Sequence, residues 1–313
     1  MAQGVSLVTG ATGFLGEHLV DSLLRSGETV VMLWHNRFRQ RSYPGLGEGI
    51  AVFGDVRDLE FMRRTLARYG VGTVYHLAAQ TQVSIAHVNP IDTFDVNVRG
   101  TWTVLEACRL EGVRRLVVAS SDKVYGECSN VDELEFKDPK CQYGVSKACA
   151  DEIAQSFNRN YDMSIAVTRC GNLYGPGDTH WRRLISGACR AAIRGEPYQL
   201  RTDGTGIRDY LFIDDAVAFY RALAASEYVG PFNYSGGEPK SAIQVINAIH
   251  SSIGRVVPAP ILDTSEVPEL KTQTLCCDKA RKLLGIRPAT SFDIGMSATV
   301  KWYKTSIVGR NAK

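Results

Sequence analysis

The chain has 313 residues, of which 44% are hydrophobic and 22% are charged, and it carries a formal net charge of +3 at pH 7. This composition is typical of a globular protein with a sizeable core, and the mild charge argues against a nucleic-acid partner. The sequence has neither a signal-peptide pattern nor an apolar run long enough to cross a bilayer. We therefore expect a cytoplasmic protein that contacts neither nucleic acid nor membrane.

The eight cysteines are spread along the chain without a CxxC pair, and no histidine pair lies beside them at metal-ligand spacing. Cys276 and Cys277 are adjacent, a spacing that disfavours an ordinary disulfide between them. The pattern predicts reduced thiols that serve in packing, and it predicts no metal site.

Short strand-like runs alternate with helical patterns through the first two thirds of the chain. The expected strands are 5–9, 29–34, 50–53, 73–77, 116–120 and 165–169, and the expected helices are 15–25, 58–69, 92–111 and 143–161. Near-continuous apolar strands separated by helices indicate a parallel sheet that is covered on both faces. Right-handed crossovers then predict an α/β fold of the doubly wound Rossmann type.

The pattern changes after residue 171. A Gly- and Pro-rich loop over 172–178 is followed by a helix at 184–194, a short hairpin within 196–209 and a helix at 213–225. A strand and turn at 232–239 precede helices at 243–253, 278–284 and 296–303. We assign residues 1–171 with 211–230 to a dinucleotide-binding Rossmann domain. Residues 172–210 with 231–313 are assigned to a small C-terminal α/β lobe that binds the substrate.

A glycine-rich loop joins the first strand to the first helix. Gly10 permits the tight turn, Gly13 lets the backbone approach a pyrophosphate, and Gly16 lets the helix pack closely on the sheet. The amides at the helix N-terminus then face the phosphates. A Gly-rich turn without a ligand is the alternative, but the position directly after the first strand favours dinucleotide binding.

The end of the second strand bears on the choice between NAD and NADP. An NAD site usually has an acidic residue there for the ribose 2′-hydroxyl, whereas residues 34–41 contain none. Arg37, Arg39 and Arg41 suit a 2′-phosphate, although a solvated basic loop explains them equally well. The cofactor is thus NAD or NADP, with a slight preference for NADP. Asp55 and Val56 follow the third strand and are expected beside the adenine.

Tyr143 and Lys147 are four residues apart on a predicted helix and therefore share one face. The ammonium of Lys147 favours the phenolate, so the sequence predicts a lowered pKa for Tyr143 and a role as a base. A surface Tyr–Lys pair is the ordinary alternative. The pair gains weight from Ser121, which follows the fifth strand, where ligands of such sheets bind. Ser121 can hydrogen-bond the substrate hydroxyl that Tyr143 deprotonates.

Six motifs run through nearly the whole chain: TGATGFLG at 9–16, HLAA at 76–79, SSDKVYG at 120–126, YGVSK at 143–147, NLYGPG at 172–177 and RDY at 208–210. Together they resemble the extended short-chain dehydrogenase/reductases of the nucleotide-sugar epimerase/dehydratase family. The resemblance implies an NAD(P)-dependent enzyme that binds a nucleotide-diphosphate sugar. It also implies a homodimer formed through helices 92–111 and 143–161.

Residues of three kinds are expected at the site. The catalytic residues are Ser121, Asp122, Lys123, Tyr143 and Lys147. The cofactor contacts are Gly10, Thr12, Gly13, Phe14, Leu15, Gly16, Asn36, Arg37, Asp55, Val56, Leu77, Ala78, Ala79, Gln80, Asn97, Ser120, Tyr143, Lys147 and Cys170. The substrate contacts are Gln82, Ser121, Asn172, Arg182, Arg183 and Arg208, for which packing or ordinary surface exposure is the alternative.

The triplet Ser121-Asp122-Lys123 separates the subgroups of this family. Epimerases usually carry a Ser-rich stretch there, many glucose-nucleotide 4,6-dehydratases carry Thr-Asp-Glu, and CDP-glucose 4,6-dehydratases carry Ser/Thr-Asp-Lys. The resemblance is therefore closest to CDP-glucose 4,6-dehydratases. By that resemblance, Tyr143 removes the O4 proton as hydride passes from C4 to the nicotinamide, Asp122 protonates the departing O6 and Lys123 accepts the C5 proton.

Two points stay open from the sequence. An ammonium is not a base, so the role of Lys123 requires its free amine, which burial and Lys147 favour and an ionised Asp122 opposes. The alternative is that Lys123 pairs with Asp122 or holds a diphosphate. The function also has alternatives, namely an NDP-sugar 4-epimerase, a 4-ketosugar reductase, or a non-catalytic regulatory protein that binds the dinucleotide.

Overall fold

A parallel sheet of seven strands forms the centre of the protein. The structure is a computed structural model that describes residues 4–35, 49–200, 202–254, 256, 258–262 and 270–308. In spatial order the strands are β3 (Ile50–Phe53), β2 (Thr29–Trp34), β1 (Val5–Thr9), β4 (Val71–His76), β5 (Arg115–Ala119), β7 (Ile165–Cys170) and β12 (Gly230–Tyr234). All of the pairings within this sheet are parallel. The predicted doubly wound Rossmann fold is confirmed.

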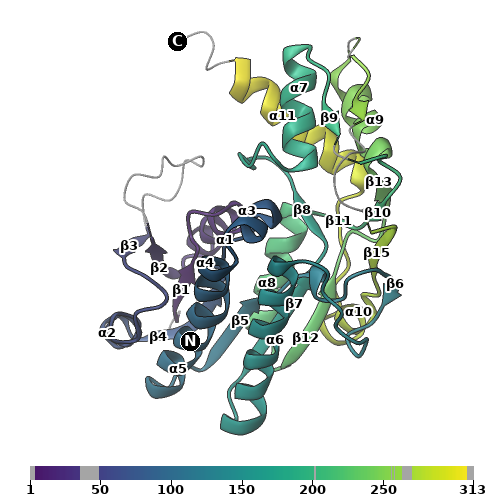
Figure 1. Cartoon of the computed structure of the whole chain (residues 1–313). Coiled ribbons are helices and arrows are strands. Elements are labelled where there is room, and N and C mark those ends of the chain that lie inside the picture. The colour runs from purple at the N-terminus through teal and green to yellow at the C-terminus, as the bar shows by residue number, and fades with distance from the viewer. Residues whose placement is uncertain are drawn as a thin grey trace.

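Helices cover both faces of this sheet (Figure 1). Alternate residues of a strand point to opposite faces, so Leu7 packs with α2 (Leu59–Tyr69), α5 (Gly100–Leu110) and α6 (Gln142–Tyr161). Val8 instead packs with α1 (Phe14–Arg25), α8 (Ile213–Ala225) and α10 (Asp278–Leu284). Because both faces of the sheet are buried, its strands consist of continuous apolar residues, as seen in the sequence.

Local signals set the ends of these helices. The Asp58 side chain accepts a hydrogen bond from the backbone N–H of Phe61 and so caps α2, which ends at Gly70 in a left-handed conformation. The helix predicted over 92–111 is divided in the structure. It consists of α4 (Pro90–Phe94), a π-helical turn over Asp95–Arg99, and α5. The π-helical turn carries Asn97 into the interior.

A second lobe lies beyond the carboxyl ends of the strands, with α7 (Leu184–Arg194), α9 (Ala242–Ile253) and α11 (Phe292–Val308) packed around one apolar core (Figure 1, upper right). Its sheet has the order β13 (Lys240–Ser241), β10 (Ile207–Arg208), β15 (Thr272–Leu275) and β6 (Cys128–Val131). Two further pairs join β8 (Asn172–Tyr174) to β11 (Tyr210–Phe212) and β9 (Gln199–Leu200) to β14 (Ile261–Leu262).

Two sequence predictions about this region are wrong in detail. The described residues of 196–209 do not pair as the expected hairpin, because β9 pairs with β14 and β10 pairs with β13 and β15. The domain boundary at residue 230 also fails, because β12 pairs with β7 in the central sheet and Ala280 of α10 lies in the core below it. Both errors have one cause, since the partners of these strands are distant in sequence.

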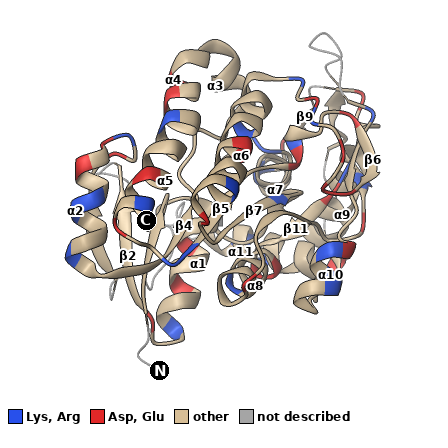
Figure 2. Ribbon diagram, turned by 90° about the horizontal axis from the view of Figure 1, so that it is seen from below, with Lys and Arg blue, Asp and Glu red and all other residues tan. Residues whose placement is uncertain are grey.

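Charged side chains are interspersed over the helices, as along α2 and α10 in Figure 2. No helix within the described ranges has both the length and the apolarity that a bilayer span requires. All eight cysteines are free thiols.

A buried ion pair joins α6 to the central sheet. Arg169 of β7 is only 1% exposed, and its Nε and Nη2 atoms donate to the Asp151 carboxylate at 2.9 Å and 3.0 Å. The remaining nitrogen, Nη1, donates to the hydroxyl of Tyr125 at 2.6 Å and to the backbone carbonyl of Glu133 at 3.0 Å. The guanidinium thus connects four segments through hydrogen bonds that are buried, apart from the part-buried one to Glu133.

We expect Asp151→Ala to lower the free energy of unfolding by about 3–5 kcal/mol, because it leaves the Arg169 guanidinium buried without its counter-charge. Urea unfolding followed by circular dichroism measures the change. Glu152→Ala on the exposed side of the same helix is the matched control and should change the free energy by less than about 1 kcal/mol. Equal losses in the two variants would contradict this account of the ion pair.

Candidate active site

A cavity of about 1440 Å³ opens above the carboxyl ends of the central strands, between the Rossmann sheet and the second lobe. Residues at the carboxyl ends of β1, β4, β5 and β7 line one side of it, among them Gly10, Leu77, Ser120 and Cys170. Residues of the second lobe, such as Tyr198 and Arg208, line the other. This is the position in which ligands bind to open parallel sheets.

The glycine-rich loop forms a narrow cradle at one end of the cavity. Gly10 has a φ of +68°, and a Cβ atom there would lie 2.8 Å from the backbone nitrogen of Ala78. Gly13 is the N-cap of α1 and provides no side-chain cap, so the amides of the first helical turn remain available to a ligand. Thr12, Phe14, Leu15 and Gly16 also line the cavity. The cradle fits a pyrophosphate at a helix N-terminus.

Asp55 and Val56 line the cavity beyond this cradle, where the adenine was expected. The Asp55 carboxylate accepts from Arg57 Nε at 3.0 Å and from Arg57 Nη2 at 2.6 Å, and this pairing holds its pKa below the ordinary value. Arg57 also donates to Asp95 at 2.6 Å. Its charge is therefore balanced by two carboxylates, and it does not provide a free cation for a 2′-phosphate. Asn36 and Arg37, with Arg39 and Arg41, lie outside the described residues, so the preference for NADP stays a prediction.

His76 supports the loop beneath the cofactor cradle, a role that the sequence did not indicate. The Thr101 hydroxyl donates to the Asn97 carbonyl and therefore accepts from His76 Nε2, at 3.1 Å. His76 Nδ1 then accepts from the Thr9 hydroxyl at 2.8 Å, and Thr9 in turn accepts from the amides of Leu77 and Ala78. Burial lowers the pKa of His76 to about 3, so the ring is neutral.

Asn97 was expected to contact the cofactor, but it does not line the cavity. Its side chain accepts from the Gln80 amide at 2.8 Å, donates to the Gln80 carbonyl at 3.0 Å and donates to Ser146 at 2.9 Å. It therefore fixes the loop that carries Ala79 and Gln80, which do line the cavity, against α6. The π-helical turn explains the difference, because it rotates Asn97 towards the interior.

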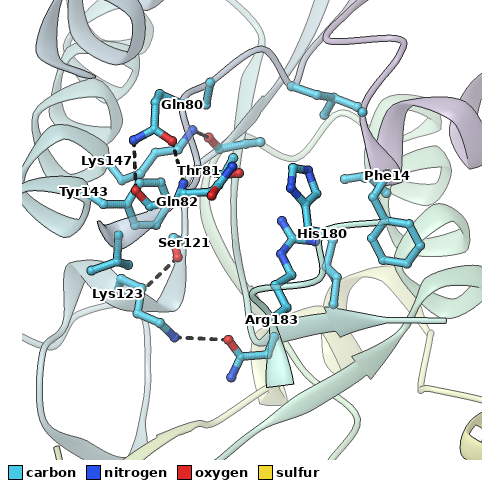
Figure 3. Close-up of a pocket in the computed structure, with 18 of the residues that line it drawn as sticks. Phe14, Gln80, Thr81, Gln82, Ser121, Lys123, Tyr143, Lys147, His180 and Arg183 are labelled. Atoms are coloured by element: carbon cyan, nitrogen blue, oxygen red, sulfur yellow. Dashed lines mark hydrogen bonds between the residues drawn. The ribbon is translucent and has the colours of Figure 1, made fainter. Parts of the chain in front are cut away.

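Tyr143 and Lys147 project from α6 into the cavity beside Ser121 (Figure 3). Burial raises the pKa of Tyr143 to about 12, although its hydrogen bond with Ser121 opposes the rise. The sequence prediction of a lowered pKa for Tyr143 is thus wrong, because desolvation dominates. Burial also lowers the pKa of Lys147 to about 8, and its Nζ donates to the Ala119 carbonyl at 2.8 Å.

Asp122 and Lys123 follow Ser121 in a 3-10 turn over Asp122–Val124. Asp122 is only 2% exposed, and its Oδ1 accepts from the Ser121 hydroxyl at 3.0 Å. Lys123 Nζ lies 2.9 Å from Asp122 Oδ2 and 2.7 Å from Gln273 Oε1. Gln273 comes from β15 in the second lobe, and no sequence motif identified it. The ion pair is the arrangement that the sequence analysis gave as the alternative to a free amine.

The cavity is lined by all of these expected substrate contacts: Gln82 after β4 on the Rossmann side, and Asn172, Arg182, Arg183 and Arg208 towards the second lobe. Arg183 pairs with Asp178 at 3.2 Å, and Arg182 reaches across to Ser84 of α3 (Val83–Val88) at 3.3 Å. His180 projects into the cavity near Arg183 (Figure 3). His180 was not expected from the sequence, because a single histidine in a loop has no spacing signal.

Comparisons with known proteins agree with this arrangement. The profile of the NAD dependent epimerase/dehydratase family matches residues 6–251. The dTDP-glucose 4,6-dehydratase of Xanthomonas campestris is 30% identical, over 96% of this chain and 93% of that protein. The solved UDP-glucose 4-epimerase of Thermotoga maritima, with UDP-glucose, has a TM-score of 0.91 and 26% identity and covers 97% of this chain and 99% of its own.

A trifunctional UDP-glucose 4,6-dehydratase/UDP-4-keto-6-deoxy-D-glucose 3,5-epimerase/UDP-4-keto-L-rhamnose-reductase of Arabidopsis thaliana is 29% identical over 95% of this chain. The chain spans 47% of that relative, about half its length. The matched profile covers most of the sequence. The chain belongs to the NAD dependent epimerase/dehydratase family, and it is an enzyme of that family.

The neutral state of His76 predicts an acid sensitivity of the fold. Its pKa of about 3 in the folded chain lies below the ~6.5 of an unfolded histidine, so the unfolded state binds more protons between these values. Stability is complete above about pH 6.5 and falls as the pH approaches 3, by a few kcal/mol in all. We expect His76→Asn to flatten the pH dependence of urea unfolding in this range. The exposed His87→Asn should leave it unchanged, and an equally steep His76→Asn profile would refute this explanation.

Proposed function

We propose that the enzyme is a 4,6-dehydratase of a nucleoside-diphosphate hexose and that it uses a bound NAD-type dinucleotide. The observation that carries the proposal is the buried carboxylate of Asp122 beside Ser121, in the same cavity as Tyr143. Oxidation at a sugar carbon needs only Tyr143 and its neighbours. Loss of water needs an additional acid and base near C5 and C6, and Asp122 supplies both in turn.

The cradle of Gly10, Gly13 and the first turn of α1 would hold the dinucleotide phosphates, with Asp55 and Val56 at the adenosine end. When bound, the cofactor supplies the hydride acceptor, taking hydride from C4 and returning it to C6. Tyr143 as phenolate takes the proton from O4, and Ser121 orients that hydroxyl. The pKa of Lys147 is about 8, so near neutral pH its side chain can carry a positive charge beside the phenolate.

The elimination follows from the ketone at C4, which acidifies the C5 proton. The Asp122 carboxylate takes this proton, and the C5–H electron pair forms the C5–C6 double bond. O6 leaves with its bonding electrons and receives the same proton from Asp122, so that water is released. The proton held by Tyr143 reaches C5 through solvent when hydride returns to C6. Asp122, Tyr143 and the cofactor all end in their starting states.

The nucleotide is the finer part of the proposal. The Ser-Asp-Lys triplet supports CDP-glucose, whereas the curated relatives support dTDP- or UDP-glucose. Arg183 and Arg208 face the cavity where a diphosphate would lie, and charge-assisted hydrogen bonds of this kind suit any of these substrates. A 4-epimerase is the second candidate, favoured by the TM-score of 0.91 to an epimerase.

Mass spectrometry of the enzyme incubated with CDP-, dTDP- and UDP-glucose tests the proposal. We expect a product lighter than one of these substrates by one water, without consumption of added NADPH.

Tyr143→Phe should lower kcat by about 10²–10⁴-fold, because the variant cannot accept the O4 proton. Asp122→Asn should abolish water loss. A product of unchanged mass would favour the epimerase, and stoichiometric NADPH consumption would favour a ketosugar reductase. Unaltered behaviour of Tyr143→Phe would favour a regulatory protein.

We also propose that two copies associate through α5 and α6. Trp102 on α5 is 46% exposed, and Leu110 and Tyr161 are exposed at the ends of the two helices, which pack side by side. Such a face suits a four-helix contact between identical chains.

Trp102→Glu should therefore shift the protein from dimer to monomer in analytical ultracentrifugation, because the contact would have to bury a carboxylate. Val256→Glu, at an exposed apolar residue of the second lobe, is the control and should leave the sedimentation coefficient unchanged. A dimer that survives Trp102→Glu would rule out this face as the contact.

A further inference from the structure

Lys123 lies at the junction of the Rossmann domain and the second lobe, on the side of the cavity that Ser121 and Tyr143 share (Figure 3). Its Nζ lies 3.0 Å and 2.9 Å from the two carboxylate oxygens of Asp122 and 2.7 Å from Gln273 Oε1. Asn172 Oδ1 is 3.4 Å away. Oxygen acceptors from three side chains therefore surround the nitrogen.

The amide of Gln273 has only one orientation that satisfies its neighbours. Its Nε2 donates to the backbone carbonyls of Gly126 at 2.9 Å and Asp122 at 3.3 Å. Both of these groups are acceptors, so the nitrogen must face them and Oε1 must face Lys123. Gln273 is 1% exposed and belongs to a strand paired on both sides, so the amide has no room to turn.

A lysine ammonium has three N–H donors and no lone pair, whereas the neutral amine has two donors and one lone pair. The ammonium can donate to Asp122, Gln273 and Asn172 together. The neutral amine would direct its lone pair at one of these oxygens, and a buried polar contact of that kind is costly. The surroundings of Lys123 therefore select the charged form.

We propose that Gln273 is a positioning residue that holds Lys123 as an ammonium, so that Lys123 acts as a fixed positive charge and not as the base that removes the C5 proton. The charge lies against the Asp122 carboxylate, which accepts that proton. It also stabilises the negative charge that develops on the substrate oxygen during enolisation. This assignment rests on the proposed function only where it concerns the reaction.

Other titratable groups face Lys123 from the elements packed around it. Asp122 lies on its own turn, Asp209 follows β10, and Cys128 begins β6. Burial raises the pKa of Asp209, and it raises the pKa of Cys128 to about 11, while Lys123 opposes both shifts. Asp122 is the carboxylate in direct contact with Lys123.

The pH dependence of kcat/KM separates the two roles of Lys123, because they predict opposite changes in Gln273→Leu. Loss of the amide acceptor makes the ammonium lose its proton at lower pH. If catalysis requires the ammonium, the descending alkaline limb of the pH profile of kcat/KM moves to lower pH in Gln273→Leu. The expected shift is about one pH unit, since the lost hydrogen bond is to a charged group. Gln273→Glu adds a carboxylate beside the ammonium and moves that limb to higher pH.

If Lys123 were the base, its deprotonation would activate the enzyme. Gln273→Leu would then move an ascending limb to lower pH and raise the rate near neutrality, and this result would overturn the proposal. Gln199→Leu, at an exposed glutamine of β9, is the matched control and should leave the profile unchanged. Gln273→Glu preserves the size of the side chain, so a folding failure of Gln273→Leu still leaves one informative variant.

A second measurement needs no turnover. In protein labelled with ¹³C-lysine, the Cε resonance of Lys123 is identified by its loss in Lys123→Met. We expect the shift of an ammonium at about pH 8, and titration at lower pH in Gln273→Leu than in the native protein. A neutral-amine shift at about pH 8 would overturn the proposal. If none of the three nucleotide sugars loses water while the ammonium resonance is present, the dehydratase proposal fails and this assignment of Lys123 stands.

Discussion

The buried guanidinium of Arg169 holds together the parts of the protein that form the cavity. It joins β7 to Asp151 of α6, and through the Tyr125 hydroxyl it reaches Asn233 of β12, which accepts from that hydroxyl at 2.8 Å. Helix α6 carries Tyr143 and Lys147, so the same ion pair sets the height of both side chains above the sheet. A charged group in this place requires every partner to be present, because an unpaired buried charge costs several kcal/mol.

Charge is distributed unevenly across the cavity. Near the cofactor cradle, burial raises the pKa of Tyr143 and lowers those of Lys147 and His76, so all three are driven towards their neutral forms. Near the second lobe, the ion pair of Asp122 and Lys123 is held by hydrogen bonds from both domains. Groups that burial drives towards neutrality thus lie beside an ion pair that hydrogen bonds from both domains hold in place.

The sequence predicted the central fold well, because strands buried on both faces have continuous apolar runs and each crossover helix has a clear period. Most of the described residues that it assigned to the site do line the cavity, since Gly10, Ser121 and Tyr143 belong to local motifs. Several of the errors concern long-range partners. Gln273 is 150 positions from Lys123 in the chain, and β12 joins the sheet through pairing that no local pattern encodes. The pKa of Tyr143 was predicted in the wrong direction because spacing reveals a neighbouring charge but not the extent of desolvation.

The π-helical turn at Asp95–Arg99 has a consequence for how this scaffold can vary. A π-helical turn is wider than an α-helical turn, so it takes up one additional residue within itself. Removing a residue there would restore regular α-helical winding, while Trp102 and the rest of α5 kept their orientation relative to α4. Asn97 would leave the Gln80 loop in the same event. The floor of the cofactor cradle can therefore change without altering the outer face of α5.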